Sequence, residues 1–277
     1  MAGKKRLDLL LVEKDLAATR EQARLLIIAG SVIVDGEIID KPGTKVREDA
    51  AVAVTSAPKY VSRGGLKLER ALDVFQIDVS GRVVVDVGAS TGGFTDCLLQ
   101  RGAARVYAVD VGYGQLDWRL RSDPRVVVME RTNARYLTEL PEPADLATVD
   151  VSFISLRQIL PSVSRLLRKG GRIVALVKPQ FEAGRRQVGK GGVVRDPEVH
   201  RLVLRGLAEW GTSERLGIQR LTVSPIRGPA GNVEFVALVA PGQVSSPDLD
   251  AQIEAALEDA KAVGRAVPAT GNGVDSQ

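Results

Sequence analysis

The sequence predicts an α/β protein built on a largely parallel sheet, with a small α+β domain in front of it. In the main domain, expected over residues 65–242, short runs rich in β-branched residues alternate with segments of helical periodicity. Several of these runs end in glycines or charged residues, as strands do beside a ligand crevice. Residues 1–58 instead show two amphipathic segments followed by a hairpin pattern. We expect a linker over 59–64, and a C-terminal helix with a disordered tail over 243–277.

The composition is that of a globular protein with mild basic character. Of 277 residues, 44% are hydrophobic and 26% charged, and neither a run of 18 apolar residues nor a signal-peptide pattern is present. We therefore expect a cytoplasmic protein with no membrane partner. A net charge of +4 suits a nucleic-acid partner but is too small to identify one. One cysteine and one histidine argue against a disulfide or a zinc site, so we expect no metal.

The N-terminal domain is predicted from periodicity and one turn. Apolar residues at helical spacing predict helices over 7–12 and 20–28. The stretch 31–39 contains Asp35-Gly36, which predicts a hairpin with a tight turn, and 51–55 reads as a further strand.

The main domain opens with the stretch Val83 to Thr95, which we interpret as a buried strand that runs into a glycine turn and a helix. The helix amides would face a ligand in that turn. Ser90 stands where a dinucleotide fingerprint has its second glycine, so the turn differs from that fingerprint. Asp110 ends the next predicted strand, 24 residues after Asp86 (110 minus 86), close to the spacing that serves a ribose hydroxyl. This pairing predicts an adenosine-containing cofactor.

The same turn is compatible with other functions. Gly88-Ala-Ser90-Thr-Gly92 also fits the nucleophile elbow of a serine hydrolase, with Asp150 and His200 following in the required order. A turn without a ligand is a further alternative.

The remaining strands deliver charged residues. We expect a helix over 66–75 and strands over 105–109, 126–129, 145–149, 173–177, 218–224 and 233–239. Lys67 precedes the first strand, Asp150 and Lys178 end later ones, and Glu234 lies within the last run. Two lysines and two carboxylates that converge on one crevice can orient an amine for proton transfer.

These features resemble a known family. The set Lys67, Asp150, Lys178 and Glu234 resembles the Lys-Asp-Lys-Glu tetrad of S-adenosylmethionine-dependent ribose 2′-O-methyltransferases of the FtsJ/RrmJ fold group. The motifs Arg6-Leu-Asp8 and Gly30-x-Val32-x-Val34-Asp35-Gly36 resemble the S4 RNA-binding domain. Together with Asp150-Val-Ser-Phe-Ile-Ser-Leu and Lys178-Pro-Gln-Phe-Glu182, the whole chain is similar to the TlyA family.

The resemblance implies a Rossmann-like methyltransferase domain that methylates the 2′-hydroxyl of cytidine in 16S or 23S ribosomal RNA. Ribosomal RNA or ribosomal subunits would be the partners, and S-adenosylmethionine the cofactor. Some family members carry a haemolysin label, for which this sequence offers no membrane-active segment. A non-catalytic ribosome-binding factor that uses the S4 domain is the further alternative. The sequence indicates nothing about oligomeric state.

The resemblance also implies roles for individual residues. Lys178 would accept the hydroxyl proton or steer the oxygen, Asp150 and Glu234 would hold the two lysines, and Lys67 would aid positioning. The cofactor residues would be Asp86, Gly88, Ala89, Ser90, Thr91, Gly92, Gly93, Phe94, Asp110, Thr132 and Asn133. The RNA contacts would be Lys5, Arg6, Arg20, Arg24 and Arg63.

Overall fold

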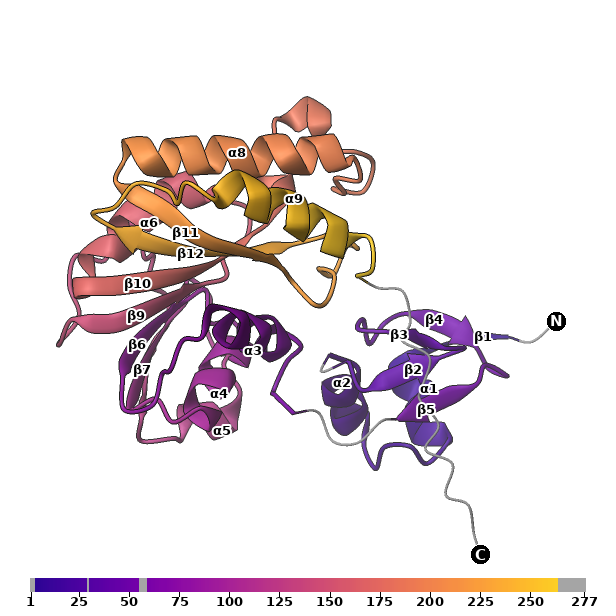
Figure 1. Cartoon of the computed structure of the whole chain (residues 1–277). Coiled ribbons are helices and arrows are strands. Elements are labelled where there is room, and N and C mark those ends of the chain that lie inside the picture. The colour runs from indigo at the N-terminus through magenta and orange to yellow at the C-terminus, as the bar shows by residue number, and fades with distance from the viewer. Residues whose placement is uncertain (1–2, 29, 55–58, 264–277) are drawn as a thin grey trace, which may run out of the picture.

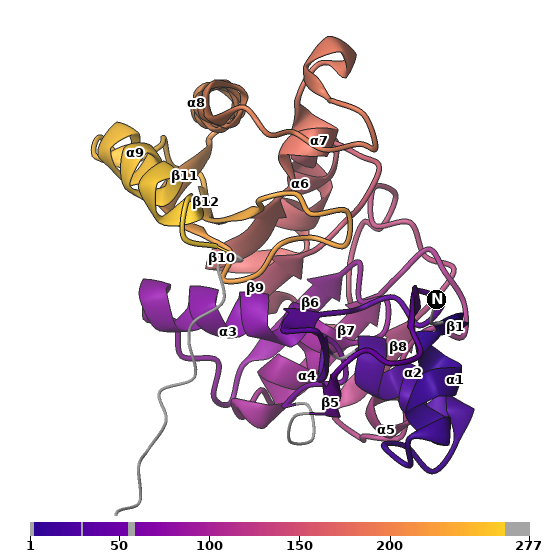
Figure 2. The ribbon, with the colours of Figure 1, turned by 90° about the vertical axis from the view of Figure 1, so that its right-hand side faces the viewer.

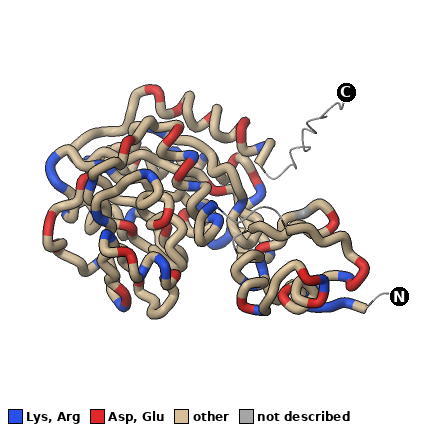
Figure 3. The backbone as a smooth tube through the Cα atoms, turned by 90° about the horizontal axis from the view of Figure 1, so that it is seen from below, with Lys and Arg blue, Asp and Glu red and all other residues tan. Residues whose placement is uncertain are grey.

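The computed structural model describes residues 3–28, 30–54 and 59–263. A larger α/β part carries the seven-stranded sheet, and a smaller N-terminal part lies beside it (Figure 1). Basic and acidic positions are intermixed over both parts (Figure 3). The predicted disordered tail at the end of the segment 243–277 lies outside the described residues, which end at residue 263.

The N-terminal part contains the two predicted helices and the predicted hairpin. Asp35 and Gly36 have φ values of 50° and 87°, as a tight hairpin turn requires. Strands β2 and β5 pair antiparallel, and β3 flanks β2 on its other side. A separate short pair, β1 with β4, was not predicted. The elements are β1 (Lys4–Arg6), α1 (Leu7–Glu13), α2 (Arg20–Ile28), β2 (Val32–Val34), β3 (Glu37–Ile38), β4 (Lys45–Arg47) and β5 (Val52–Val54).

The main sheet has the strand order β11-β12-β10-β9-β6-β7-β8. Strand β12 runs antiparallel to both of its neighbours, and the other adjacent pairs are parallel. The chain leaves β6 toward β7 on one side and later returns to β9 on the other, so a ligand crevice is expected where these strands end. This arrangement confirms the predicted Rossmann-like α/β fold. The strands are β6 (Val83–Val87), β7 (Arg105–Val109), β8 (Val126–Met129), β9 (Ala144–Val149), β10 (Leu167–Val177), β11 (Leu216–Val223) and β12 (Phe235–Pro241).

Helices cover both faces of the sheet, which explains why its strands are apolar on both sides. On β6, Val84 packs toward α3 and α4, whereas Val85 packs toward the α6 and α8 side (Figure 2). The helices are α3 (Gly64–Phe75), α4 (Gly93–Gln100), α5 (Trp118–Arg121), α6 (Leu156–Arg165), α7 (Pro179–Glu182), α8 (Pro197–Ser213) and α9 (Leu249–Ala260), with a 3₁₀ turn over Arg185–Gln187.

The predicted C-terminal helix is present as α9, and it packs on α8 and β11. Its buried side chains, including Ile253 at 1% exposure, belong to the same hydrophobic core as the sheet. The helix is therefore part of the main α/β body.

Candidate active site

The turn after β6 is shaped by its glycines and by neighbouring strands. Gly88 has φ 84°, and its N–H donates to the carbonyl of Val109 at 2.8 Å. A Cβ atom there would lie 2.4 Å from the carbonyl oxygen of Asp150. Only glycine therefore lets the ends of β6 and β9 approach so closely.

Asp110 follows β7 and faces the same turn. Its Oδ2 accepts a hydrogen bond from the backbone N–H of Ser90 at 2.8 Å, and its Oδ1 accepts one from the N–H of Gly112 at 2.7 Å. Two backbone donors fix the plane of this carboxylate, and charge-assisted bonds of this kind are strong. Asp110 is therefore held ready to receive further donors from a ligand.

A pocket of about 460 Å³ lies at the ends of β6, β7 and β9, within the size range of cofactor sites. Its wall combines apolar side chains with a few polar groups. Five of the residues predicted to bind cofactor line it: Gly88, Ser90, Asp110, Thr132 and Asn133.

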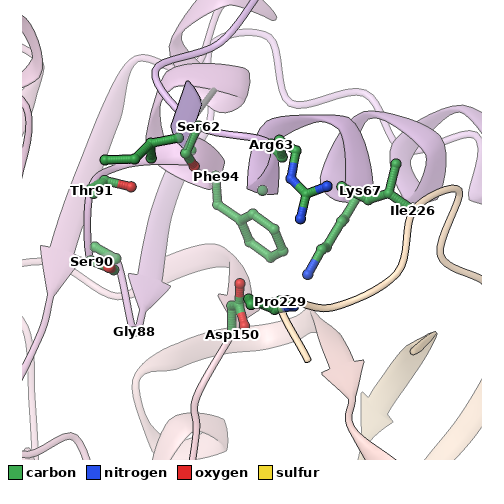
Figure 4. A pocket seen from close by; sticks show the side chains of 14 residues that line it. Ser62, Arg63, Lys67, Gly88, Ser90, Thr91, Phe94, Asp150, Ile226 and Pro229 are labelled. Carbon is green, nitrogen blue, oxygen red and sulfur yellow. The ribbon is translucent and has the colours of Figure 1, made fainter. Parts of the chain in front are cut away.

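A second pocket, of about 180 Å³, adjoins the first and shares Gly88, Ser90 and Asp150 with it. Lys67 from α3 and Asp150 from the end of β9 both project into it (Figure 4). Four more of the predicted cofactor residues line this pocket: Ala89, Thr91, Gly93 and Phe94.

Two of the residues predicted to bind cofactor lie behind the turn instead of lining either pocket. Asp86 is fully buried, and its carboxylate accepts hydrogen bonds from the hydroxyls of Thr95 at 2.7 Å and Thr148 at 2.8 Å. Burial raises the pKa of Asp86 to about 6. A Cβ on Gly92 would lie 2.2 Å from the side chain of Leu120, so this glycine serves the packing of α5.

The first lysine–carboxylate pair is buried. Lys67 on α3 donates to Oε2 of Glu234 at 2.5 Å, with side-chain exposures of 9% and 1%. Because a buried ion is costly to leave alone, each group requires the other.

The second pair is partly open to solvent. Nζ of Lys178 lies 2.6 Å from Oδ1 of Asp150, and it also donates to the hydroxyl of Ser152 at 2.9 Å. Lys178 immediately precedes α7, where Pro179 takes a first-turn position that needs no backbone donor. The four residues of the predicted tetrad thus form two ion pairs, and Lys67 and Asp150 share one pocket.

The serine hydrolase alternative is wrong. His200 is buried on α8, with a ring nitrogen 3.1 Å from the carbonyl oxygen of Val194 and its ring edge toward Phe235. Burial lowers the pKa of His200. The hydroxyl of Ser90 lies 3.4 Å from Oε1 of Gln115, and Asp150 pairs with Lys178. A matching order along the chain therefore does not create a triad.

The residues predicted to contact RNA differ in whether their basic groups are already paired with carboxylates. Arg6 donates two hydrogen bonds to the buried carboxylate of Asp8, at 2.9 and 2.8 Å, and Arg20 donates a third at 3.0 Å. The bond from Arg6 is the main reason that the pKa of Asp8 falls to about 2. Lys5 pairs with Glu13 at 2.8 Å.

Arg24 and Arg63 complete the set. Arg24 is exposed and pairs with none of the carboxylates in the described part of the chain. Arg63 forms an ion pair with Asp40 of the N-terminal part and also lines the smaller pocket, so it lies between the two parts.

Sequence reasoning missed several residues that organise the site: Asp8, Asp40, Ser152 and Glu182. Asp8 and Glu182 stand within motifs that were noticed, but nothing local indicates their partners. Ser152 sits two residues after Asp150, which is the one available signal.

Comparison with known proteins places these features in a family. The sequence pattern described as FtsJ-like methyltransferase matches residues 60–240, and the S4 domain pattern matches residues 5–52. The 16S/23S rRNA (cytidine-2′-O)-methyltransferase TlyA of Mycobacterium tuberculosis is 50% identical, over 85% of this chain and 89% of its own. The chain belongs to the TlyA family.

Other relatives of this chain agree over similar lengths. Hemolysin A of Brachyspira hyodysenteriae is 40% identical, over 84% of this chain and 98% of its own. A Streptococcus thermophilus protein of known structure is 44% identical and covers 94% of this chain and 97% of its own, with a TM-score of 0.74. The likeness therefore extends across both parts of the molecule.

The TlyA-family chain is an S-adenosylmethionine-dependent methyltransferase, and the larger pocket fits that cofactor. The carboxylate of Asp110 can accept hydrogen bonds from ribose hydroxyls, and Asn133 offers an amide beside the apolar Val111 and Ile154, as a purine requires. Within residues 3–28, 30–54 and 59–263, no group of three His, Cys, Asp or Glu side chains could hold a metal ion.

Proposed function

We propose that this protein transfers a methyl group from S-adenosylmethionine to the ribose 2′-hydroxyl of cytidine in ribosomal RNA, in the 16S or 23S molecule. The observation that carries the proposal is the Asp150–Lys178 pair, which lies beside a pocket fitted for the cofactor. The S4 domain and the activity in the name of the Mycobacterium tuberculosis relative support RNA as the substrate. The site of action would be the cytoplasm, where ribosomal RNA is made.

The cofactor supplies a methyl group that is already activated by a positive sulfur, so the protein has mainly to align the two substrates. Lys178 steers the 2′-oxygen and, in its neutral amine form, accepts the hydroxyl proton. Asp150 holds that amine in place. Glu234 holds Lys67, which helps to position the target. Gly88, Ser90 and Asp110 would hold the cofactor.

The target atom separates RNA from DNA, because only RNA has a 2′-hydroxyl. An RNA oligonucleotide that contains the target cytidine should be methylated. The same oligonucleotide with 2′-deoxycytidine at that position should bind the protein but accept no methyl group.

The decisive experiment follows tritiated methyl transfer to free 16S and 23S RNA and to intact subunits. Lys178→Ala should lower kcat by at least about 100-fold, since a positioned acid or base typically contributes ~10²–10⁴. Its affinity for S-adenosylmethionine, measured by calorimetry, should stay within about threefold of the wild type. Lys169→Ala is the control, because Lys169 lies at the opposite end of β10. Normal methylation by Lys178→Ala would exclude this role for Lys178. A wild-type protein that transfers no methyl group to any of these substrates would instead leave a non-catalytic ribosome factor as the better account.

The haemolysin name of the Brachyspira hyodysenteriae relative does not lead us to a second proposal. Among the described residues, no helix combines the length and apolar character needed to cross a membrane.

A further inference from the structure

Glu182 is a half-buried carboxylate with no part in the proposed reaction. It ends α7, four residues after Lys178 (182 minus 178). Its Oε1 accepts a hydrogen bond from the backbone N–H of Leu156 at 2.7 Å, and its Oε2 accepts one from the hydroxyl of Ser155 at 2.7 Å. Both donors lie at the beginning of α6, so Glu182 joins two segments that are distant in the sequence.

Those two segments carry the Asp150–Lys178 pair. Residues 151–155, which connect Asp150 to α6, belong to no helix or strand. Phe153 within them has φ 64°, a strained value for a residue with a side chain. Asp150 itself is held by the sheet, because its backbone N–H donates to the carbonyl of Val87 at 2.9 Å. The residues after it do not fix their own shape, so the placement of Ser152 beside Lys178 depends on contacts from elsewhere.

The contacts come from the segment that begins at Lys178. Besides the two Glu182 bonds, the rings of Phe153 and Phe181 lie 5.1 Å apart, and Lys178 contacts Asp150 and Ser152. The Asp150–Lys178 pair is itself partly open to water, with side-chain exposures of 23% and 11%, so its geometry needs support. The two Glu182 hydrogen bonds are partly buried, whereas the bond from Lys178 to Ser152 is exposed.

We propose that Glu182 is a positioning residue that holds the Asp150 loop against the Lys178 segment and so sets the geometry of the catalytic pair. This inference rests on the proposed function, because it concerns the pair that would handle the 2′-hydroxyl. Glu182 itself touches neither substrate nor cofactor.

The contacts of Glu182 depend on the length of its side chain rather than on its charge. Glu182 must extend from α7 to the first turn of α6 and offer an oxygen to Leu156. Burial raises the pKa of Glu182, which also disfavours a role that depends on its charge. Glutamine keeps the length and can still accept from Leu156, with its amide group donating to Ser155. Aspartate keeps the charge but is one methylene shorter.

The test compares Glu182→Gln, Glu182→Asp and Glu182→Ala in the full-length protein, with Glu209→Ala on the exposed side of α8 as the control. The readouts are kcat, KM for ribosomal RNA and calorimetric affinity for S-adenosylmethionine. We expect Glu182→Asp and Glu182→Ala to lose roughly 10- to 100-fold in kcat, as small misplacements of catalytic groups do, with KM and cofactor affinity within about twofold. Glu182→Gln should keep kcat within about threefold of the wild type.

Contrary results are equally clear. The inference is overturned if Glu182→Asp is as active as Glu182→Gln, or if the loss appears in KM or cofactor affinity rather than in kcat. If Glu182→Ala fails to fold, the comparison of Glu182→Gln with Glu182→Asp still tests the inference. If the wild type itself transfers no methyl group to ribosomal RNA, the proposed function is wrong. That outcome differs from one in which the wild type is active and Glu182→Asp has the same kcat, which contradicts only the role of Glu182.

Discussion

At the scale of single residues, the site depends on carboxylates whose surroundings differ. Glu234 is buried against one lysine, Asp150 is half-open beside another, and Asp110 is held by two backbone donors. Asp86 is the most enclosed, with hydroxyl donors but no cation bonded to it. Each carboxylate therefore responds differently to substitution.

Asp86 should make the folded protein less stable as pH rises. Its pKa in the folded state, about 6, lies above the ordinary value of ~3.9, because burial disfavours the ion. The folded state thus binds the proton more tightly than the unfolded state does, and stability falls between about pH 4 and pH 6. The full effect is roughly 3 kcal/mol, at ~1.4 kcal/mol for each tenfold change in affinity.

Asp86→Asn removes this contribution. Its free energy of unfolding by urea, relative to that of the wild type, should rise by about 2–3 kcal/mol between pH 4 and pH 7. The surface variant Asp78→Asn is the control. If the unfolding free energies of Asp86→Asn and the wild type change in parallel between pH 4 and pH 7, Asp86 does not titrate as the structure indicates.

At the scale of helices and strands, the sequence patterns predicted the elements that depend on local residues, but not the pairing of elements that are distant in the chain. The main strands are largely runs of apolar, often β-branched residues bounded by turns, so their positions follow from periodicity. The exception is the first half of β10, where charged residues and two glycines precede the predicted run 173–177. Strands β1 and β4 carry mostly basic residues and pair across some 40 positions, which no local pattern shows. His200 stands in hydrolase order along the chain, yet α8 carries it into the core.

The same limit explains which residues of the candidate site were missed. Lys67, Asp150, Lys178 and Glu234 could be found because they flank predicted strands and resemble a family tetrad. Glu182 could not, because its partners are a backbone amide and a hydroxyl on another helix. Gly92 and Asp86 were assigned to the cofactor by their place in the turn, whereas packing turns both away from the pockets.

Asp8 joins three elements of the N-terminal domain, since it lies on α1 and binds Arg6 from β1 and Arg20 from α2. Its pKa of about 2 means that this stabilisation is complete above about pH 4 and is lost as pH falls toward 2. Asp8→Asn should speed hydrogen exchange in α1 and α2 at neutral pH by at least about tenfold. Exchange in the main sheet should be unchanged. Equal protection of α1 and α2 in the variant and the wild type would count against Asp8 as the link.

At the scale of the whole molecule, the proposed function assigns affinity for RNA and chemistry to different parts of the chain. The S4 domain offers exposed basic residues, whereas the ion pairs and both pockets gather at the carboxyl ends of the main strands. Arg63 connects the two, because it pairs with Asp40 and lines the pocket of Lys67. A change confined to the S4 surface should therefore alter RNA binding without altering methyl transfer.

Arg24 is the residue that best tests this separation, because Lys5, Arg6 and Arg20 are already bound to carboxylates. Arg24→Glu should raise KM for ribosomal RNA by about tenfold and reduce the slope of log affinity against log salt by about one, as expected for one lost phosphate contact. At saturating RNA, kcat should match the wild type, and so should calorimetric affinity for S-adenosylmethionine. Lys169→Glu, at the far end of the main sheet, is the charge-matched control and should leave the salt slope unchanged. A fall in kcat for Arg24→Glu would mean that the S4 domain also positions the target base, because lost affinity alone disappears once RNA is saturating.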